Sequence, residues 1–214
     1  MNERGQYLPY KIKSVTDTPP ESVAHSLQTI PVRQCPTPLG PGRNDPFFGA
    51  LTVDFVQRAF GVMAATPRHT YQVLTKRATR LERLASRLPW PENVWIGVSV
   101  ENAAQLARIA ALRNVPAAVR FVSAEPLLGP LAGVDLSGLD WLIAGGESGP
   151  HARPVQAEWL RDLRDACRNA GVAFFFKQWG GRTPKTGGRT LDGRTWDQMP
   201  RFGADRVTLV SAGR

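Results

Sequence analysis

The stretch WLIAGGESGPHARPV, from Trp141 to Val155, places groups that can exchange protons directly after an apolar run. The apolar run ends at two glycines, and a glutamate, a serine, a histidine and an arginine come within a few positions of them. Glycine lacks a Cβ, so it lets a ligand approach the backbone or permits a positive φ angle. The stretch is therefore interpreted either as a polar turn or as the rim of an active site.

Four other short apolar runs, at residues 69–75, 93–99, 119–123 and 172–176, also end in polar or charged side chains. Converging carboxylates and lysines suit cation binding, general acid–base catalysis or the binding of a polar cofactor. The predicted catalytic residues are Lys76, Glu101, Glu125, Glu147 and Lys177. The predicted cofactor-binding residues are Ser99, Gly145, Gly146, Ser148, Gln178 and Trp179. The ordinary alternative is that strand ends meet water and that Glu101 simply begins a helix.

The elements that must position these residues alternate along the chain. Helical spacing of apolar residues at 53–63, 78–88, 102–113 and 158–170 mostly separates the five apolar runs. This alternation is typical of a parallel sheet covered by helices. Right-handed crossovers place the carboxyl ends of all the strands on one edge, where such folds carry their chemistry. We predict an α/β fold, either a parallel sheet or a partial (β/α) barrel.

The first part of the chain differs from the rest. Prolines crowd residues 1–46, and neither helical nor strand periodicity persists there. We predict an irregular N-terminal arm at 1–46, either disordered or unrelated in origin to the rest of the chain. An α/β partial-barrel domain is expected at 47–200, and a C-terminal tail at 201–214.

Composition restricts the partners and the compartment. The 214-residue chain has a formal net charge of +9, which favours a nucleic-acid partner. An arginine-rich, alanine-rich composition is also typical of a GC-rich genome, and basic residues interleaved with aromatic ones do not occur as a run. Apolar stretches fall short of the roughly 18 residues of a membrane span, and the N-terminus lacks the apolar core of a signal peptide. We therefore expect a cytoplasmic protein with no membrane partner.

Familiar cofactor motifs are missing from the sequence. It has two cysteines, Cys35 and Cys167, and its three histidines have no spacing that fits zinc, so no metal site is predicted. Neither a GxGxxG motif after a strand nor a Walker loop is present. Trp179, Trp196 and the arginines between them are a candidate lid over the strand ends.

Five sequence blocks occur in an order that resembles a known family. The blocks TYQVLTKR, NVWIGVSVEN, RFVSAEPLLGPL, WLIAGGESGPHARP and FFFKQWGG resemble the bacteriophage-type three-Cys-motif family, whose function is unknown and whose fold is radical-SAM-like. The resemblance covers about 47–200. It implies a partial (β/α) barrel with S-adenosylmethionine and an iron–sulfur cluster as cofactors, and Glu147 in contact with the amino group of S-adenosylmethionine.

The chain departs from that family at the cysteines. A cluster of this kind is held by three neighbouring thiolates, and no cysteine triple occurs in the sequence. A shifted reading frame or a truncated gene would explain residues 1–46. We therefore expect a truncated relative of a radical-SAM-like enzyme that keeps a strand-end pocket without the cluster ligands.

Two alternative functions are left open. The first is a nucleic-acid-binding or partner-binding module of phage or mobile-element origin, which the net charge favours. The second is a hydrolase, with or without a metal, that is built on the three glutamates at the strand ends.

Overall fold

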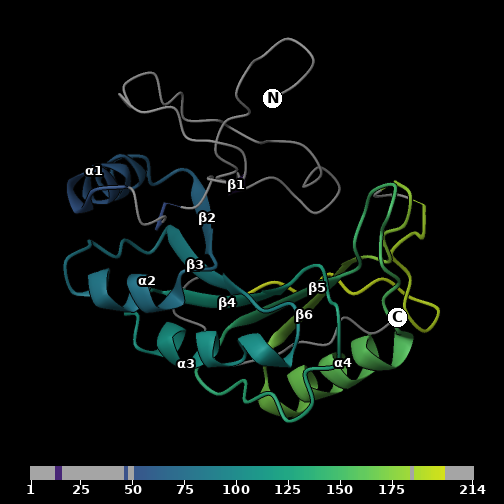
Figure 1. Cartoon of the computed structure of the whole chain (residues 1–214). Helices are drawn as coiled ribbons and strands as arrows, with labels where there is room; N and C mark the ends of the chain where they lie inside the picture. The colour runs from purple at the N-terminus through teal and green to yellow at the C-terminus, as the bar shows by residue number, and fades with distance from the viewer. Residues whose placement is uncertain (1–12, 16–45, 48–50, 184–185, 201–214) are drawn as a thin grey trace. The chain divides into compact units, whose positions relative to one another are not determined.

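The computed structural model of the chain describes residues 13–15, 46–47, 51–183 and 186–200 (Figure 1). These residues fall into two compact units. The first unit holds the described residues up to Val98 together with Ala110–Ala118. The second unit holds Ser99–Ile109 and the described residues from Val119 onward.

The first unit combines two parallel strands with helices. Its elements are β1 (Lys13–Val15), α1 (Val53–Ala64), β2 (Thr70–Thr75), α2 (Ala78–Ala85) and β3 (Val94–Ser99). The last residue of β3, Ser99, belongs to the second unit. Strand β2 pairs in parallel with β3 and antiparallel with β1. Strand β1 lies within residues 1–46, which were predicted to form an irregular arm. The rest of 1–45 falls outside the described residues.

A local cap explains where α1 begins, and a distant asparagine joins the end of the helix to β2. The Thr52 side chain caps the helix by accepting a hydrogen bond from the backbone N–H of Phe55 at 3.3 Å. The Asn93 amide donates to the carbonyls of Met63 and His69 at 2.9 Å each, which ties the helix end to the start of the strand. Phe60 and Met63 are buried on the inner face of α1.

The second unit holds three parallel strands of the sheet. Strands β4 (Val119–Ala124), β5 (Trp141–Gly145) and β6 (Ala173–Gln178) pair in this order. Helix α4 (Ala157–Ala170) connects β5 to β6 and packs against β6 (Figure 1). Every residue of β5 is buried, as expected for a central strand of a parallel sheet. Gly171 ends α4 in the left-handed conformation that glycine favours at this position.

The free edge of β6 is covered by a segment near the end of the described chain. The backbone N–H of Phe176 donates to the carbonyl of Trp196 at 2.9 Å, and that of Gln198 donates to the carbonyl of Phe174 at 3.2 Å. The Trp196 ring is buried against Phe174, with ring centroids 6.0 Å apart. Trp196 therefore caps a sheet edge. It does not form the lid over the strand ends that the sequence suggested.

The predicted α/β class with parallel strands is confirmed. All five predicted strands are present as β2 to β6. The helix predicted over 102–113 is divided into a short 3₁₀ turn, η1 (Ala103–Gln105), and α3 (Ala107–Arg113). In the described part of the chain, no helix has the length and apolarity to cross a membrane.

Candidate functional site at the carboxyl ends of β4, β5 and β6

Three side chains meet where the strands of the second unit end. The Glu125 carboxylate lies directly after β4 and accepts hydrogen bonds from two directions. One carboxylate oxygen lies 3.0 Å from the Lys177 ammonium nitrogen, and the other lies 3.2 Å from the Ser123 hydroxyl. Because β4, β5 and β6 are parallel and adjacent, residues from the outer two strands reach one another across the end of the middle strand. Glu125 and Lys177, two of the five predicted catalytic residues, are therefore brought together.

Gly145, the last residue of β5, makes room for this pair. A Cβ at this position would lie 3.1 Å from the Glu125 Oε1 atom and 3.5 Å from the Lys177 Cβ. The backbone N–H of Leu127 donates to the Gly145 carbonyl at 2.9 Å and holds the segment after β4 against the end of β5. The glycine therefore permits the close approach of a side chain from the neighbouring strand.

The pair is partly open to solvent. The Glu125 side chain is 18% exposed and the Lys177 side chain is 42% exposed, whereas Ser123 is buried. Ion pairs with this degree of exposure contribute only about 0.2–1 kcal/mol, because water solvates both charges when they separate. A charged ligand could exchange for either partner at small cost.

A second carboxylate of the predicted set is buried beside β4. Glu101 is 8% exposed, and its carboxylate lies 3.0 Å from the Arg108 guanidinium. The same guanidinium donates to the backbone carbonyl of Ser99 at 2.6 Å. The backbone N–H of Val100 donates to the Ser123 carbonyl at 3.0 Å, so this segment lies alongside β4. Arg108 belongs to the arrangement and was not predicted.

The third carboxylate, Glu147, is held by its own arginine. The Arg153 guanidinium contacts both carboxylate oxygens, at 2.8 and 2.9 Å, and the Arg153 backbone N–H adds a bond of 3.0 Å. Hydrogen bonding to Arg153 is the main reason why the pKa of Glu147 falls to about 2. The ion pair between Glu147 and Arg153 therefore closes the loop of residues 148–152, and we call this pair the clasp.

The glycines of the GGE stretch and of the WGG stretch allow two backbones to cross. A Cβ at Gly146 would lie 1.9 Å from the Trp179 carbonyl oxygen, and one at Gly180 would lie 2.0 Å from the Glu147 carbonyl oxygen. The backbone N–H of Gly181 donates to that Glu147 carbonyl at 2.8 Å. Gly145 and Gly146 were predicted to let a ligand approach the backbone or to permit a positive φ angle, but at Gly146 the space is filled by the Trp179 carbonyl.

The remaining predicted residues support this crossing or lie elsewhere. The Gln178 amide donates to the Ser148 hydroxyl at 2.8 Å. The Trp179 indole donates to the Thr190 carbonyl at 2.8 Å, and its ring packs edge-on against Phe176. Lys76 comes directly after β2 in the first unit, so the structure does not group it with the residues of the second.

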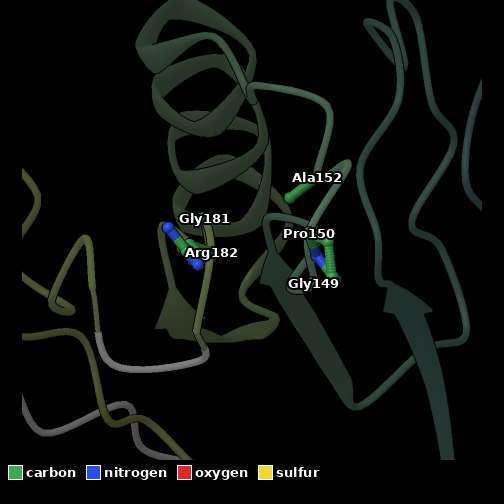
Figure 2. Close-up of a pocket in the computed structure, with 5 residues that line it drawn as sticks. All are labelled: Gly149, Pro150, Ala152, Gly181 and Arg182. Carbon is green, nitrogen blue, oxygen red and sulfur yellow. The ribbon is translucent and has the colours of Figure 1, made fainter.

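A hollow lies beside the crossing and was not predicted. Its volume is about 330 Å³, and its lining residues are Gly149, Pro150, Ala152, Gly181 and Arg182. Figure 2 shows the first three on one loop, facing the last two on the segment after β6. In the sequence, only the glycines of the two lining segments, Gly149 and Gly181, pointed to such a hollow. The shapes of the loops that form it are set by tertiary contacts.

The chain does not provide the ligands of an iron–sulfur cluster. Cys167 is buried in α4, and burial raises its pKa to about 12, so it stays a protonated core thiol. Cys35 is the second of the two cysteines and lies outside the described residues. Three thiolates cannot come from two cysteines, so the residues do not fit the cluster that the family resemblance implies.

The structure offers no support for a metal-dependent hydrolase. Across residues 51–183 and 186–200, no group of three or more histidine, cysteine, aspartate or glutamate side chains could hold a metal ion. Each of the three glutamates instead faces its own basic residue. The predicted nucleic-acid partner stays a prediction, and several arginines of the second unit are engaged in ion pairs.

Comparison with known proteins gives a family without a known activity. The family model described as "Protein of unknown function (DUF5131)" matches residues 40–200, which is more than half of the chain. Neither a curated protein nor a solved structure matches the chain significantly.

Proposed function

We propose that the chain, which belongs to the DUF5131 family of proteins of unknown function, binds a small molecule bearing an amino-acid group at the carboxyl ends of β4, β5 and β6. The observation that carries the proposal is the Glu125–Lys177 pair above Gly145. The two charges are opposite, adjacent and partly exposed. They therefore match a zwitterion whose ammonium faces Glu125 and whose carboxylate faces Lys177.

The location of the pair supports binding of a ligand. Open α/β sheets bind their ligands outside the carboxyl ends of the strands. Ser123 donates to the Glu125 oxygen that Lys177 leaves free, so the carboxylate keeps its orientation when the lysine moves. An amino-acid group that replaced the ion pair would leave both side chains with a charged partner, which avoids the cost of an unpaired charge.

S-adenosylmethionine is the candidate ligand that the sequence favours. The ordered blocks resemble those of a radical-SAM-like family, and we propose that the fold is a partial (β/α) barrel of that lineage. S-adenosylmethionine carries the amino-acid group that the pair would bind. Glu125 suits the ligand's ammonium better than Glu147, because Arg153 already contacts both oxygens of Glu147. The proposal concerns binding and includes no reaction that depends on an iron–sulfur cluster.

Calorimetric titration of the purified chain with S-adenosylmethionine tests the proposal. We expect binding by the wild-type chain and a loss of affinity of about tenfold or more in Lys177→Met and in Glu125→Gln, since about 1.4 kcal/mol corresponds to a factor of ten. Glu92→Gln is the matched control, because Glu92 is exposed and lies in the first unit. The proposal is wrong if S-adenosylmethionine does not bind at millimolar concentration, or if Lys177→Met and Glu125→Gln bind it as the wild-type chain does.

A further inference from the structure

The hollow beside Ser148 has the dimensions of a site for a small ligand. Its volume of about 330 Å³ lies at the lower end of the range that small-molecule pockets occupy. A Cβ at Gly149 would meet no atom within 4 Å, so the space beside this backbone is open. Glycine, proline and alanine form most of the lining, and the five residues lie on two facing walls (Figure 2).

The two walls of the hollow are fixed to each other. The backbone N–H of Gly149 on one wall donates to the carbonyl of Gly181 on the other at 2.9 Å. The N–H of Gly181 donates back to the carbonyl of Glu147 at 2.8 Å. Arg153 holds the carboxylate of the same glutamate and closes the loop at its far end. A hollow formed in this way before binding needs little ordering when a ligand enters.

The charge of the lining is positive. Arg182 is the one charged residue among the five that line the hollow. Within the described parts of the chain, no carboxylate forms an ion pair with Arg182, whereas Arg153 nearby is paired with Glu147. A guanidinium is a planar fork that binds two oxygens of an oxyanion at once. A phosphate ester carries more negative charge and more acceptor oxygens than a carboxylate, and therefore gains more from such a group.

We infer that this hollow binds the phosphate group of a small phosphate ester, with Arg182 as the residue that contacts the phosphate. The inference goes beyond the proposed function, because the two sites use different residues. The Glu125–Lys177 pair lies over Gly145, whereas the hollow is formed by the loop after Ser148 and by the segment after β6.

Titration of the whole chain with adenosine 5′-monophosphate, monitored by calorimetry, tests the inference, and adenosine, inorganic phosphate and acetate serve as comparison probes. We expect the monophosphate and inorganic phosphate to bind, and adenosine and acetate to bind at least tenfold more weakly. Arg182→Gln should weaken the monophosphate by about tenfold or more, and Ala152→Glu, which adds a carboxylate to the lining, should abolish binding. Arg58→Gln is the matched control, because Arg58 is exposed on α1 in the first unit.

The outcomes separate this site from the strand-end site. If the inference is correct, Lys177→Met leaves monophosphate binding unchanged. It is overturned if the monophosphate does not bind, if acetate binds as well as inorganic phosphate, or if Arg58→Gln weakens binding as much as Arg182→Gln. Equal binding by Arg182→Gln and the wild-type chain would overturn it as well.

Discussion

Substitution of Gly146 by alanine is expected to destabilise the second unit strongly. The new Cβ would lie 1.9 Å from the Trp179 carbonyl oxygen and 2.7 Å from its carbonyl carbon. Contacts of a real Cβ essentially never fall below 3.0 Å, so one backbone must move by about 1 Å or more. The obstructing atoms are backbone, and a rotamer change cannot relieve the clash.

The magnitude depends on the bonds that this movement would strain. The N–H of Gly146 donates to the Gln178 carbonyl at 2.9 Å, and that of Trp179 donates to the Gly188 carbonyl at 3.0 Å. Overpacking costs about 1–3 kcal/mol, and each lost hydrogen bond costs about 0.5–1.5 kcal/mol. We expect a loss of about 3 kcal/mol in the free energy of unfolding, which corresponds to a fall of roughly 6–12 °C in Tm for a chain of this size.

Two other glycines provide the controls in the same assay, thermal unfolding monitored by circular dichroism. Gly145→Ala should cost less than about 1 kcal/mol, because its closest contact, at 3.1 Å, is the end of the Glu125 side chain. Gly61→Ala in α1 meets no atom within 4 Å and should stabilise by about 0.5–1 kcal/mol. The reasoning is refuted if Gly146→Ala unfolds at the wild-type temperature, or if Gly145→Ala is the more damaging of the two.

Two further predictions concern the clasp and the covered edge of β6. The lowered pKa of Glu147 means that its stabilising contribution is present above about pH 4.5 and is lost as the pH falls through about 2. Carbon-13 NMR should therefore show the Glu147 carboxyl titrating near 2 in the wild-type chain and near its ordinary value of 4.5 in Arg153→Gln; an ordinary value in both would contradict the clasp. Trp196→Ala should lower the free energy of unfolding in urea by about 3–5 kcal/mol, because the ring is buried against Phe174 and lies beneath Arg194. Trp196→Phe should cost less than half as much, and equal stability of Trp196→Ala and the wild-type chain would show that the edge needs no cover.

The sequence was sufficient to predict the strand ends and the polar residues that lie there. Alternating apolar runs indicated the α/β class, and parallel strands must end on one edge. Glu125 and Lys177 each lie at the end of such a run, and the structure brings them within 3.0 Å. Strand periodicity indicated this result because β4, β5 and β6 are parallel, so residues at their carboxyl ends lie at one edge of the sheet.

Spacing along the chain could not show which partner each carboxylate has. Arg153 lies only six residues from Glu147, yet their pairing depends on a loop that turns back on itself. Arg108 contacts Glu101 from α3, where η1 and α3 replace the single helix that the apolar spacing predicted. The glycine pair had two interpretations, approach of a ligand to the backbone or a positive φ angle, and neither glycine has a positive φ. The position of the Trp179 carbonyl, which fills the space beside Gly146, could not be read from the sequence.

The hollow and the cover over β6 were outside the reach of sequence patterns for a similar reason. Both are formed by irregular segments whose hydrogen bonds go to distant backbone, such as that between Gly149 and Gly181. Irregular segments carry no periodicity that would reveal their neighbours. Trp196 was recognised as a residue of interest, but its burial against Phe174 could not be deduced from its position in a glycine-rich and polar stretch.

A crystal structure of the chain with bound S-adenosylmethionine is the most direct test of the strand-end site. The proposal predicts that the ligand's carboxylate lies within hydrogen-bond distance of the Lys177 ammonium and its amino group within hydrogen-bond distance of the Glu125 carboxylate. The direct contact of 3.0 Å between these two side chains would then be replaced by the ligand. A ligand bound elsewhere, with the Glu125–Lys177 pair intact, would contradict the proposal.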